Sequence, residues 1–255
     1  MTVHERVDNS RVAVVTGAGS GLGKAIAEVL LTDGFRVALL GRRRHKLEEV
    51  GDRAAASRAL VLPTDVTAAE QVAAAFETVV SVWGRVDVLV NNAGVFGPSG
   101  DPDAIALDDW RRTVETNVTG AFLCAREAFG VMKRQQPRGG RIINNGSISA
   151  QVPRPKSIAY SATKHAVTGL TRSLALDGRP YDIACSQIDI GNAFTEMTAG
   201  IAESALQADG TSRPEPTFDP VHAAGAVLHI ARLPLGVSVP SLTIVATGMP
   251  YLGRG

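Results

Sequence analysis

Tyr160 and Lys164 are spaced for proton chemistry. They lie four residues apart in a segment that has apolar positions at helical spacing from Ser157 onward. Residues at this spacing share one face of a helix, with Cβ atoms about 5–6 Å apart. Free tyrosine has a pKa of about 10, and a neighbouring cation favours the phenolate and lowers that value. The pair therefore predicts a site where Tyr160 exchanges a proton, although such pairs also occur by chance on exposed helices.

A third polar side chain is placed to join this pair. Ser147 lies thirteen residues before Tyr160, directly after a predicted strand at residues 141–145. A strand that ends there would deliver the serine hydroxyl to the cleft that the Tyr160 helix borders.

Four glycines follow the first predicted strand, in the sequence TGAGSGLG at Thr16–Gly23. A helical pattern continues from there to Gly34, and a second strand follows at residues 35–40, which makes a βαβ unit. In this position, glycines let main-chain N–H groups approach a pyrophosphate at the helix N-terminus. The turn therefore predicts a dinucleotide cofactor.

The end of the second strand indicates which dinucleotide. A carboxylate at this position bonds the ribose 2′-hydroxyl of NAD, whereas an arginine accommodates the 2′-phosphate of NADP. The chain has Arg42, Arg43 and Arg44 there and no acid. Three cations at a helix N-terminus oppose the helix dipole, and a phosphate partner would explain them. NADP(H) is favoured, NAD(H) remains possible, and a solvated basic turn is the alternative without a ligand.

Asp65 follows the third predicted strand, where the adenine of a dinucleotide would lie. The same aspartate could instead cap the next helix, a position for which Thr67 competes.

Apolar runs alternate with helical patterns along the whole chain. The predicted strands are residues 11–16, 35–40, 59–62, 86–90, 141–145, 183–188 and 242–246. The predicted helices are residues 25–34, 45–56, 68–83, 108–134 (broken near Thr113), 157–176, 196–207 and 220–231. This alternation predicts an α/β fold in three layers, with a doubly wound, seven-stranded parallel sheet covered on both faces.

One domain is expected over residues 1–255, with an N-terminal extension at 1–10 and a substrate-loop region at about 192–220. Residues 208–220 are rich in Gly, Pro and Ser, which predicts a mobile loop over an active site.

Composition excludes several classes of function. The chain has 255 residues, 45% of them hydrophobic and 20% charged, with a formal net charge of +1. With a net charge this close to zero, the protein has no overall electrostatic attraction for nucleic acid or an anionic membrane. No apolar run reaches 18 residues, the five histidines lack metal-ligand spacing, and Cys124 and Cys185 fall in apolar segments. We expect a cytoplasmic protein with reduced core cysteines and no metal.

Taken together, these motifs resemble the short-chain dehydrogenases/reductases over roughly residues 11–250. The resemblance is carried by TGAGSGLG, NNAG at Asn91–Gly94, Asn117 in ETNVTG, Ser147, and YSATK at Tyr160–Lys164. It implies a Rossmann-type sheet with strand order 3-2-1-4-5-6-7.

The resemblance also implies roles for the site residues. Tyr160 would be the general acid/base, and Lys164 would bind the nicotinamide ribose and lower the pKa of the tyrosine. Ser147 would bond the reacting carbonyl, and Asn117 would hold a water molecule of a proton relay. The implied cofactor-binding residues are Gly17, Ser20, Gly21, Leu22, Gly23, Arg42, Arg43, Asp65, Val66, Asn92, Ala93, Gly94, Tyr160, Lys164, Gly191 and Thr195.

Two departures from the family pattern are visible. The usual Pro-Gly after the sixth strand is Ile190-Gly191 here, which predicts a less rigid loop entry. The usual Asp-Gly-Gly near the C-terminus is replaced at Thr247–Pro250, which we expect to affect a subunit interface more than the chemistry.

The predicted function is an NADP(H)-dependent oxidoreductase that interconverts a ketone or aldehyde with an alcohol, of which a 3-oxoacyl-type reductase is one form. An NAD-dependent alcohol or sugar dehydrogenase and a non-catalytic nucleotide-binding regulator are the alternatives. The expected partners are a small-molecule substrate and further copies of the chain, as a tetramer or a dimer built on residues 121–134 and 157–176. The expected pocket lining is Val95, Phe96, Ser149, Gln151, Val152, Arg154, Phe194 and Met197.

Overall fold

The computed structural model describes residues 11–54 and 57–251. The predicted extension at residues 1–10 lies outside this part of the chain. Seven parallel strands form one sheet in the order β3-β2-β1-β4-β5-β6-β9. They are β1 (Val12–Thr16), β2 (Arg36–Gly41), β3 (Ala59–Pro63), β4 (Val88–Asn91), β5 (Gly140–Asn145), β6 (Ile183–Gly191) and β9 (Ser241–Val245). The predicted fold class and strand order are confirmed, with β9 as the seventh strand.

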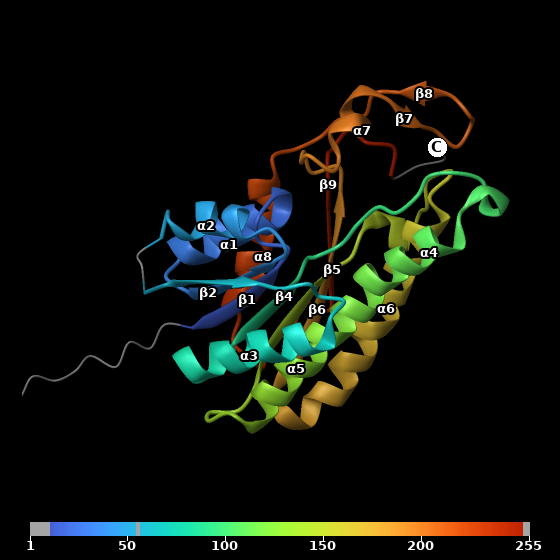
Figure 1. The fold of residues 1–255 in the computed structure, drawn as a ribbon. Coiled ribbons are helices and arrows are strands. Elements are labelled where there is room, and N and C mark those ends of the chain that lie inside the picture. The colour runs from blue at the N-terminus through green and yellow to red at the C-terminus, as the bar shows by residue number, and fades with distance from the viewer. Residues whose placement is uncertain (1–10, 55–56, 252–255) are drawn as a thin grey trace, which may run out of the picture.

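Helices cover both faces of the sheet (Figure 1). One face packs against α1 (Gly21–Thr32), α2 (Arg44–Gly51) and α8 (Pro220–Arg232). The other face packs against α3 (Ala69–Trp83), α5 (Gly120–Arg134) and α6 (Ile158–Gly178). The central strands are buried on both sides, which explains their continuous β-branched and aliphatic sequence.

The carboxyl ends of four neighbouring strands position the candidate site. Since parallel strands end at one edge, the turn after β1, the NNAG segment after β4, Ser147 after β5 and Gly191 at the end of β6 meet there. The strand order reverses between β1 and β4, and ligands of open α/β sheets bind at such a reversal.

The long helix predicted at residues 108–134 is divided by a wider turn. It consists of α4 (Leu107–Val114), a π-helical segment at Glu115–Thr119 and α5. The break predicted near Thr113 therefore lies a few residues later. A π turn contains one extra residue, and here it carries the buried Asn117.

The C-terminal third differs most from prediction. The helix predicted at 196–207 is reduced to α7 (Ala199–Glu203), and an antiparallel hairpin of β7 (Ala205–Leu206) and β8 (Ser212–Arg213) follows. This hairpin takes part of the stretch predicted as a mobile loop, and Figure 1 shows it above the carboxyl edge of the sheet.

Smaller features complete the description. The helix predicted at 45–56 ends at Gly51, as α2, and residues 55–56 lie outside the described part of the chain. Short 3-10 turns occur at Pro102–Ala104, Ile148–Ala150 and Arg179–Tyr181. Among the described residues, no helix combines the length and apolar character that crossing a membrane requires.

Candidate active site

A cleft of about 780 Å³ runs along the carboxyl edge of the sheet. The glycine turn after β1 lines one end, and residues of α7 and β7 line the other. Ser147, Tyr160 and Lys164 all face it. The tyrosine and the lysine therefore share one cleft with the glycine turn.

Tyr160 lies in the first turns of α6, with its ring packed edge-on against Phe96 (centroids 4.9 Å apart, planes at 74°). Burial raises the pKa of the Tyr160 hydroxyl, a hydrogen bond with Ser147 lowers it, and the Asp189 carboxylate raises it further. The Lys164 ammonium lies 5.5 Å from the ring centroid. The prediction of a lowered pKa is wrong for the protein groups taken together, because burial of the phenolate outweighs the favourable contacts.

Lys164 lies one helical turn further along α6 and is 6% exposed. Its Nζ donates a hydrogen bond to the Asn145 carbonyl oxygen at 2.8 Å. Burial lowers the pKa of Lys164 to about 8, and Asp189 acts in the opposite direction. The ammonium therefore changes its charge close to physiological pH, which suits a proton-transfer site.

Ser147 follows β5 in an extended conformation and is 5% exposed. Its main-chain N–H donates to Asp189 Oδ1 at 2.9 Å, and its Oγ accepts from the Ser149 N–H at 3.1 Å. Its hydroxyl also makes the hydrogen bond with Tyr160 and faces the cleft.

The Asn117 side chain joins two segments through hydrogen bonds. Its Nδ2 donates to the Val95 carbonyl oxygen at 2.8 Å and to Thr163 Oγ1 at 3.0 Å, and its Oδ1 accepts from the Val95 N–H at 2.8 Å. These bonds tie the segment after β4 to α6. The side chain is buried and is not among the residues that line the cleft.

The glycine turn is shaped for close backbone approach. Gly17 and Gly21 have positive φ angles of 65° and 49°, which glycine adopts without strain. A Cβ at position 23 would overlap the Gly17 carbonyl oxygen and the Asn92 side chain. Thr16 Oγ1 accepts from the N–H groups of Asn92 and Ala93, both at 2.9 Å, and so joins the turn to the NNAG segment. Main-chain N–H groups at the start of α1 can thus hold a pyrophosphate.

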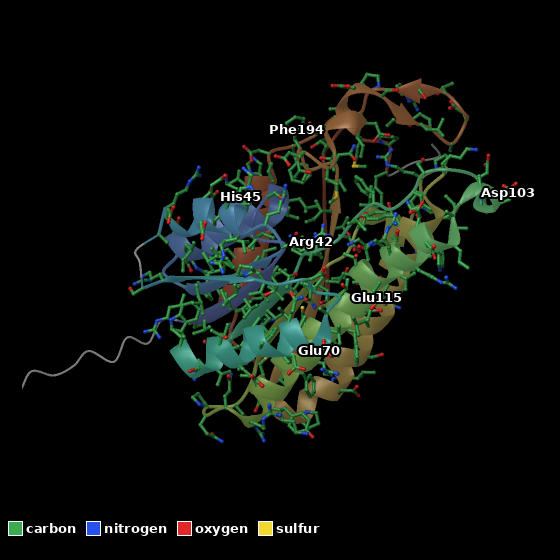
Figure 2. All side chains as sticks on the ribbon, in the orientation of Figure 1. Arg42, His45, Glu70, Asp103, Glu115 and Phe194 are labelled. Carbon is green, nitrogen blue, oxygen red and sulfur yellow. The ribbon has the colours of Figure 1, made fainter. Side chains whose placement is uncertain are left out.

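The arginine corner contributes one side chain to the cleft. Arg43 lines it and donates from Nη2 to Ser20 Oγ at 3.2 Å. Arg42, labelled in Figure 2, does not line it. Asp65 Oδ1 accepts from the Thr67 N–H at 3.0 Å and from Thr67 Oγ1 at 2.8 Å, so its carboxylate closes the turn before α3. These bonds lower the pKa of Asp65, with a smaller effect from Arg42.

Most of the predicted site residues meet in the cleft. Those that line it are Gly17, Ser20, Gly21, Leu22, Gly23, Arg43, Asn92, Ala93, Gly94, Ser147, Tyr160, Lys164, Gly191 and Thr195. Those that the structure does not bring into its lining are Arg42, Asp65, Val66 and Asn117.

The substrate side of the cleft was predicted in part. Val95, Phe96, Ser149, Arg154 and Met197 line it, whereas Gln151, Val152 and Phe194 do not. Gln151 turns to Asp189 instead. Phe194 is 53% exposed and lies on the segment between β6 and α7 (Figure 2).

Sequence reasoning missed a polar network that holds this segment. Glu215, 4% exposed, binds both terminal nitrogens of Arg154 at 2.6 and 2.5 Å. Its carboxylate also accepts from Asn192 at 2.8 Å and from Gln207 at 2.9 Å. Burial would raise the pKa of Glu215, but these hydrogen bonds hold it at about 2. No pattern in the sequence predicts this network.

The network also holds the residue after Gly191, where the sequence lacks the usual proline. Asn192 has a positive φ of 61° and is bonded to Glu215, to Arg154 and to the Pro216 carbonyl oxygen. Side-chain bonds therefore hold the loop entry that a proline ring would otherwise stiffen.

The C-terminal turn also lies closer to the chemistry than predicted. Met249 is 6% exposed and packs in a cluster with Ile148 and Ala246. The Tyr251 hydroxyl donates to Gln151 Oε1 at 2.7 Å. The turn therefore supports the residues directly after Ser147.

A parallel sheet with a glycine turn at its reversal of strand order defines a dinucleotide-binding fold of the Rossmann type. The family model for short chain dehydrogenase matches residues 11–205. The chain belongs to the short-chain dehydrogenase family and is an NAD(P)-dependent oxidoreductase acting on CH–OH groups.

Two sequence relatives illustrate the range of the family. An uncharacterised oxidoreductase of Staphylococcus aureus (strain N315) is 33% identical over 92% of this chain and 96% of its own length. A 3beta-hydroxysteroid dehydrogenase of Mediterraneibacter gnavus is 33% identical over 74% of this chain and 68% of its own length.

Two solved structures are similar over nearly the whole fold. The 3-ketoacyl-(acyl-carrier-protein) reductase of Brucella melitensis, complexed with NADH, has a TM-score of 0.83 and 26% identity and covers 94% of this chain and 98% of its own. The actinorhodin polyketide ketoreductase, with NADPH, has a TM-score of 0.83 and 29% identity and covers 94% of this chain and 97% of its own.

The glycine turn makes a direct prediction. In G23A the new Cβ would push against the Gly17 carbonyl and distort the turn. We expect the affinity for NAD(P)H to fall by about tenfold or more, measured by titrating the fluorescence of the reduced cofactor. The control is G225A, because a Cβ at Gly225 in α8 meets open space. Equal affinities in the two variants would contradict this reading of the turn.

A second prediction concerns the hydrogen bonds of Glu215. In E215Q the bidentate ionic contact to Arg154 is lost, and we expect amide hydrogen exchange in residues 205–216 to accelerate by about tenfold, since a hydrogen bond to a charged group contributes about 1.5–3 kcal/mol. E203Q, at an exposed position in α7, is the matched control. Because the pKa of Glu215 lies below its unfolded value of about 4.5, the stabilisation is complete above that pH and disappears as pH falls towards 2. Unchanged exchange in E215Q would contradict the assignment.

Proposed function

We propose that the protein is an NADP(H)-dependent oxidoreductase that interconverts an uncharged ketone or aldehyde with its alcohol, with Tyr160 as the general acid/base. One observation carries the proposal. Ser147, Tyr160 and Lys164 face a single cleft, and the glycine turn lines one end of this cleft. A carbonyl beside Ser147 and Tyr160 would thus lie next to a dinucleotide whose pyrophosphate rests on the start of α1.

The site residues then have complementary tasks. When bound, the cofactor supplies or accepts a hydride. In reduction, the hydroxyls of Ser147 and Tyr160 donate hydrogen bonds to the carbonyl oxygen, on which negative charge develops. Tyr160 passes its proton to that oxygen, and the Lys164 ammonium stabilises the phenolate that remains. Asn117 keeps the Val95 segment and α6 in register, as a positioning residue.

The basic corner favours NADP(H) over NAD(H). Arg43 lines the cleft at the end of β2, where the chain offers no carboxylate for a free ribose 2′-hydroxyl. A guanidinium binds a phosphate through charge-assisted hydrogen bonds. Arg42 lies next to it and adds positive charge near the same position.

The substrate side favours an uncharged molecule. Arg154 faces the cleft, but its positive charge is compensated by an ion pair with Glu215. Apolar contacts come from Val95, Phe96 and Met197. An apolar ketone of the 3-oxoacyl or steroid type suits this lining, and the relatives named above include a ketoacyl reductase, a polyketide ketoreductase and a hydroxysteroid dehydrogenase.

A homo-oligomer accompanies this proposal. The helices α5 and α6 expose Phe122 (47%), Ile158 (43%) and Leu176 (57%), and apolar side chains on neighbouring helices suit contact with a second copy of the chain.

The assignment of Tyr160 is tested by Y160F, which removes the exchangeable proton and keeps the ring against Phe96. We expect kcat for reduction to fall by about 100- to 10,000-fold, while the affinity for NADPH changes little. Steady-state kinetics on a panel of ketones, with cofactor titration alongside, measures both. Y181F is the control, since Tyr181 packs against Phe129 and lies just before β6, at the opposite end of this strand from the cleft. Full activity of Y160F would reject the mechanism.

The cofactor preference is tested at the arginine corner. In R43L we expect NADPH affinity to fall by about tenfold or more, because a charge-assisted contact to the 2′-phosphate is lost, while NADH affinity stays within twofold, roughly, of the wild type. R44L is the matched control, since Arg44 is exposed and pairs with Glu48. A clear preference of the wild-type protein for NADH would overturn the proposal for NADP(H).

A further inference from the structure

Strand β6 carries a carboxylate into the interior of the molecule. Asp189 is 1% exposed, and it follows the buried Gln187 by two residues, so that both side chains lie on one face of the sheet. Within the described part of the chain, Asp189 belongs to no ion pair. An acid at such a position is costly unless its charge is used or compensated.

Three N–H donors converge on this carboxylate. Its Oδ1 accepts from the Ser147 N–H at 2.9 Å and from Gln187 Nε2 at 2.7 Å, and its Oδ2 accepts from Gln151 Nε2 at 3.0 Å. An ionised carboxylate is an acceptor only, so three donors match its charged form. One of them is the main chain of Ser147 itself.

The segment before Ser147 rests directly on the carboxylate. A Cβ at Gly146 would overlap Asp189 Oδ1 and the Gln187 amide. The absence of a side chain at Gly146 thus lets β5 and β6 approach closely enough for the Ser147 N–H to bond Asp189. Gly146 and Asp189 together position the main chain of Ser147.

The charge of Asp189 also reaches the other two reactive groups. It raises the pKa of Tyr160 and of Lys164. For Tyr160 this adds to the effect of burial, and for Lys164 it opposes burial.

The other ionisable side chains that line the cleft are Arg43, Arg154, Lys156 and Glu196, and none of them is among the causes that shift the pKa of Tyr160 or Lys164. On α6 the next ionisable side chain is His165, which is exposed and bonded to the Ser161 carbonyl. The end of β5 contributes the amides Asn144 and Asn145, and the π turn contributes Asn117; none of these titrates. Among the described residues, Asp189 is therefore the carboxylate that acts on the pair.

We propose that Asp189 is a positioning residue of the reaction centre, which holds the main chain at Ser147 and supplies a fixed negative charge that favours the protonated forms of Tyr160 and Lys164, so that the site is prepared to reduce a carbonyl. This inference rests on the proposed function. Reduction consumes the Tyr160 proton, whereas oxidation of an alcohol requires the phenolate. A fixed negative charge behind the pair favours the form that reduction needs.

The test removes the charge and keeps the shape. In D189N the new Oδ1 still accepts from Ser147 and Gln187, and the new amide donates to Gln151 once the Gln151 amide has turned. We expect the alkaline midpoint of kcat/KM for ketone reduction, and the acidic midpoint for alcohol oxidation, both to move to lower pH by about one unit. The control is D177N, since Asp177 is exposed near the distal end of α6. Lower rates at every pH with unmoved midpoints would show a structural role only and would overturn the proposal.

A second measurement needs no substrate. NMR of lysine-labelled protein, with K164R to assign the signal, gives the titration midpoint of Lys164 directly. We expect a midpoint of about 8 in the wild type and a lower one in D189N. D189S, which leaves a small neutral side chain, is the second variant if thermal unfolding shows that D189N does not fold. An unchanged midpoint in the variants would overturn the inference. Absence of carbonyl reductase activity in a wild type that shows the expected midpoints would instead overturn the proposed function alone.

Discussion

The structure depends on placing an ammonium group beneath a phenol, out of contact with bulk water. Removing a cation from water is costly, and a buried lysine loses its proton unless nearby groups compensate. Lys164 finds a carbonyl oxygen at Asn145 and the negative charge of Asp189. Because both partners lie at the ends of neighbouring strands, the register of β5 and β6 determines the electrostatics of the site.

Two further polar systems extend outward from this centre. Thr16, Asn92 and Asn145 join the glycine turn to the ends of β4 and β5 through hydrogen bonds. On the opposite side, Glu215 binds Arg154 and Asn192 and holds the segment after β6 over the cleft. The first system lies at the glycine turn, and the second holds residues of the segment after β6 that line the cleft. Among the charged side chains that line the cleft, Arg154 is compensated by Glu215 and Lys156 by Asp101.

Some features were predictable because they follow from local spacing. The βαβ unit around Thr16–Gly23 and the i, i+4 relation of Tyr160 and Lys164 require only a helix to begin where it does. The break in the helix around Asn117 was anticipated, but its position and its π geometry were not, since both depend on the bonds of Asn117 to Val95 and Thr163. The segment 196–207 was predicted as a helix because its composition favours one. Contacts of Gln207 and Glu215 outweigh that preference and leave a short helix and a hairpin.

By itself, the sequence determined the class of fold and, through its family motifs, the order of the strands, and it predicted which residues exchange a proton or bind a phosphate. These depend on patterns within about thirty residues, such as the βαβ unit, which local periodicity records. Only the tertiary structure decided the direction in which the pKa of Tyr160 moves, the loss of free charge at Arg154, and the place of Asp189 behind Ser147. Each of these results from burial and from partners distant in the chain, and the free energy of a charge depends on its three-dimensional surroundings.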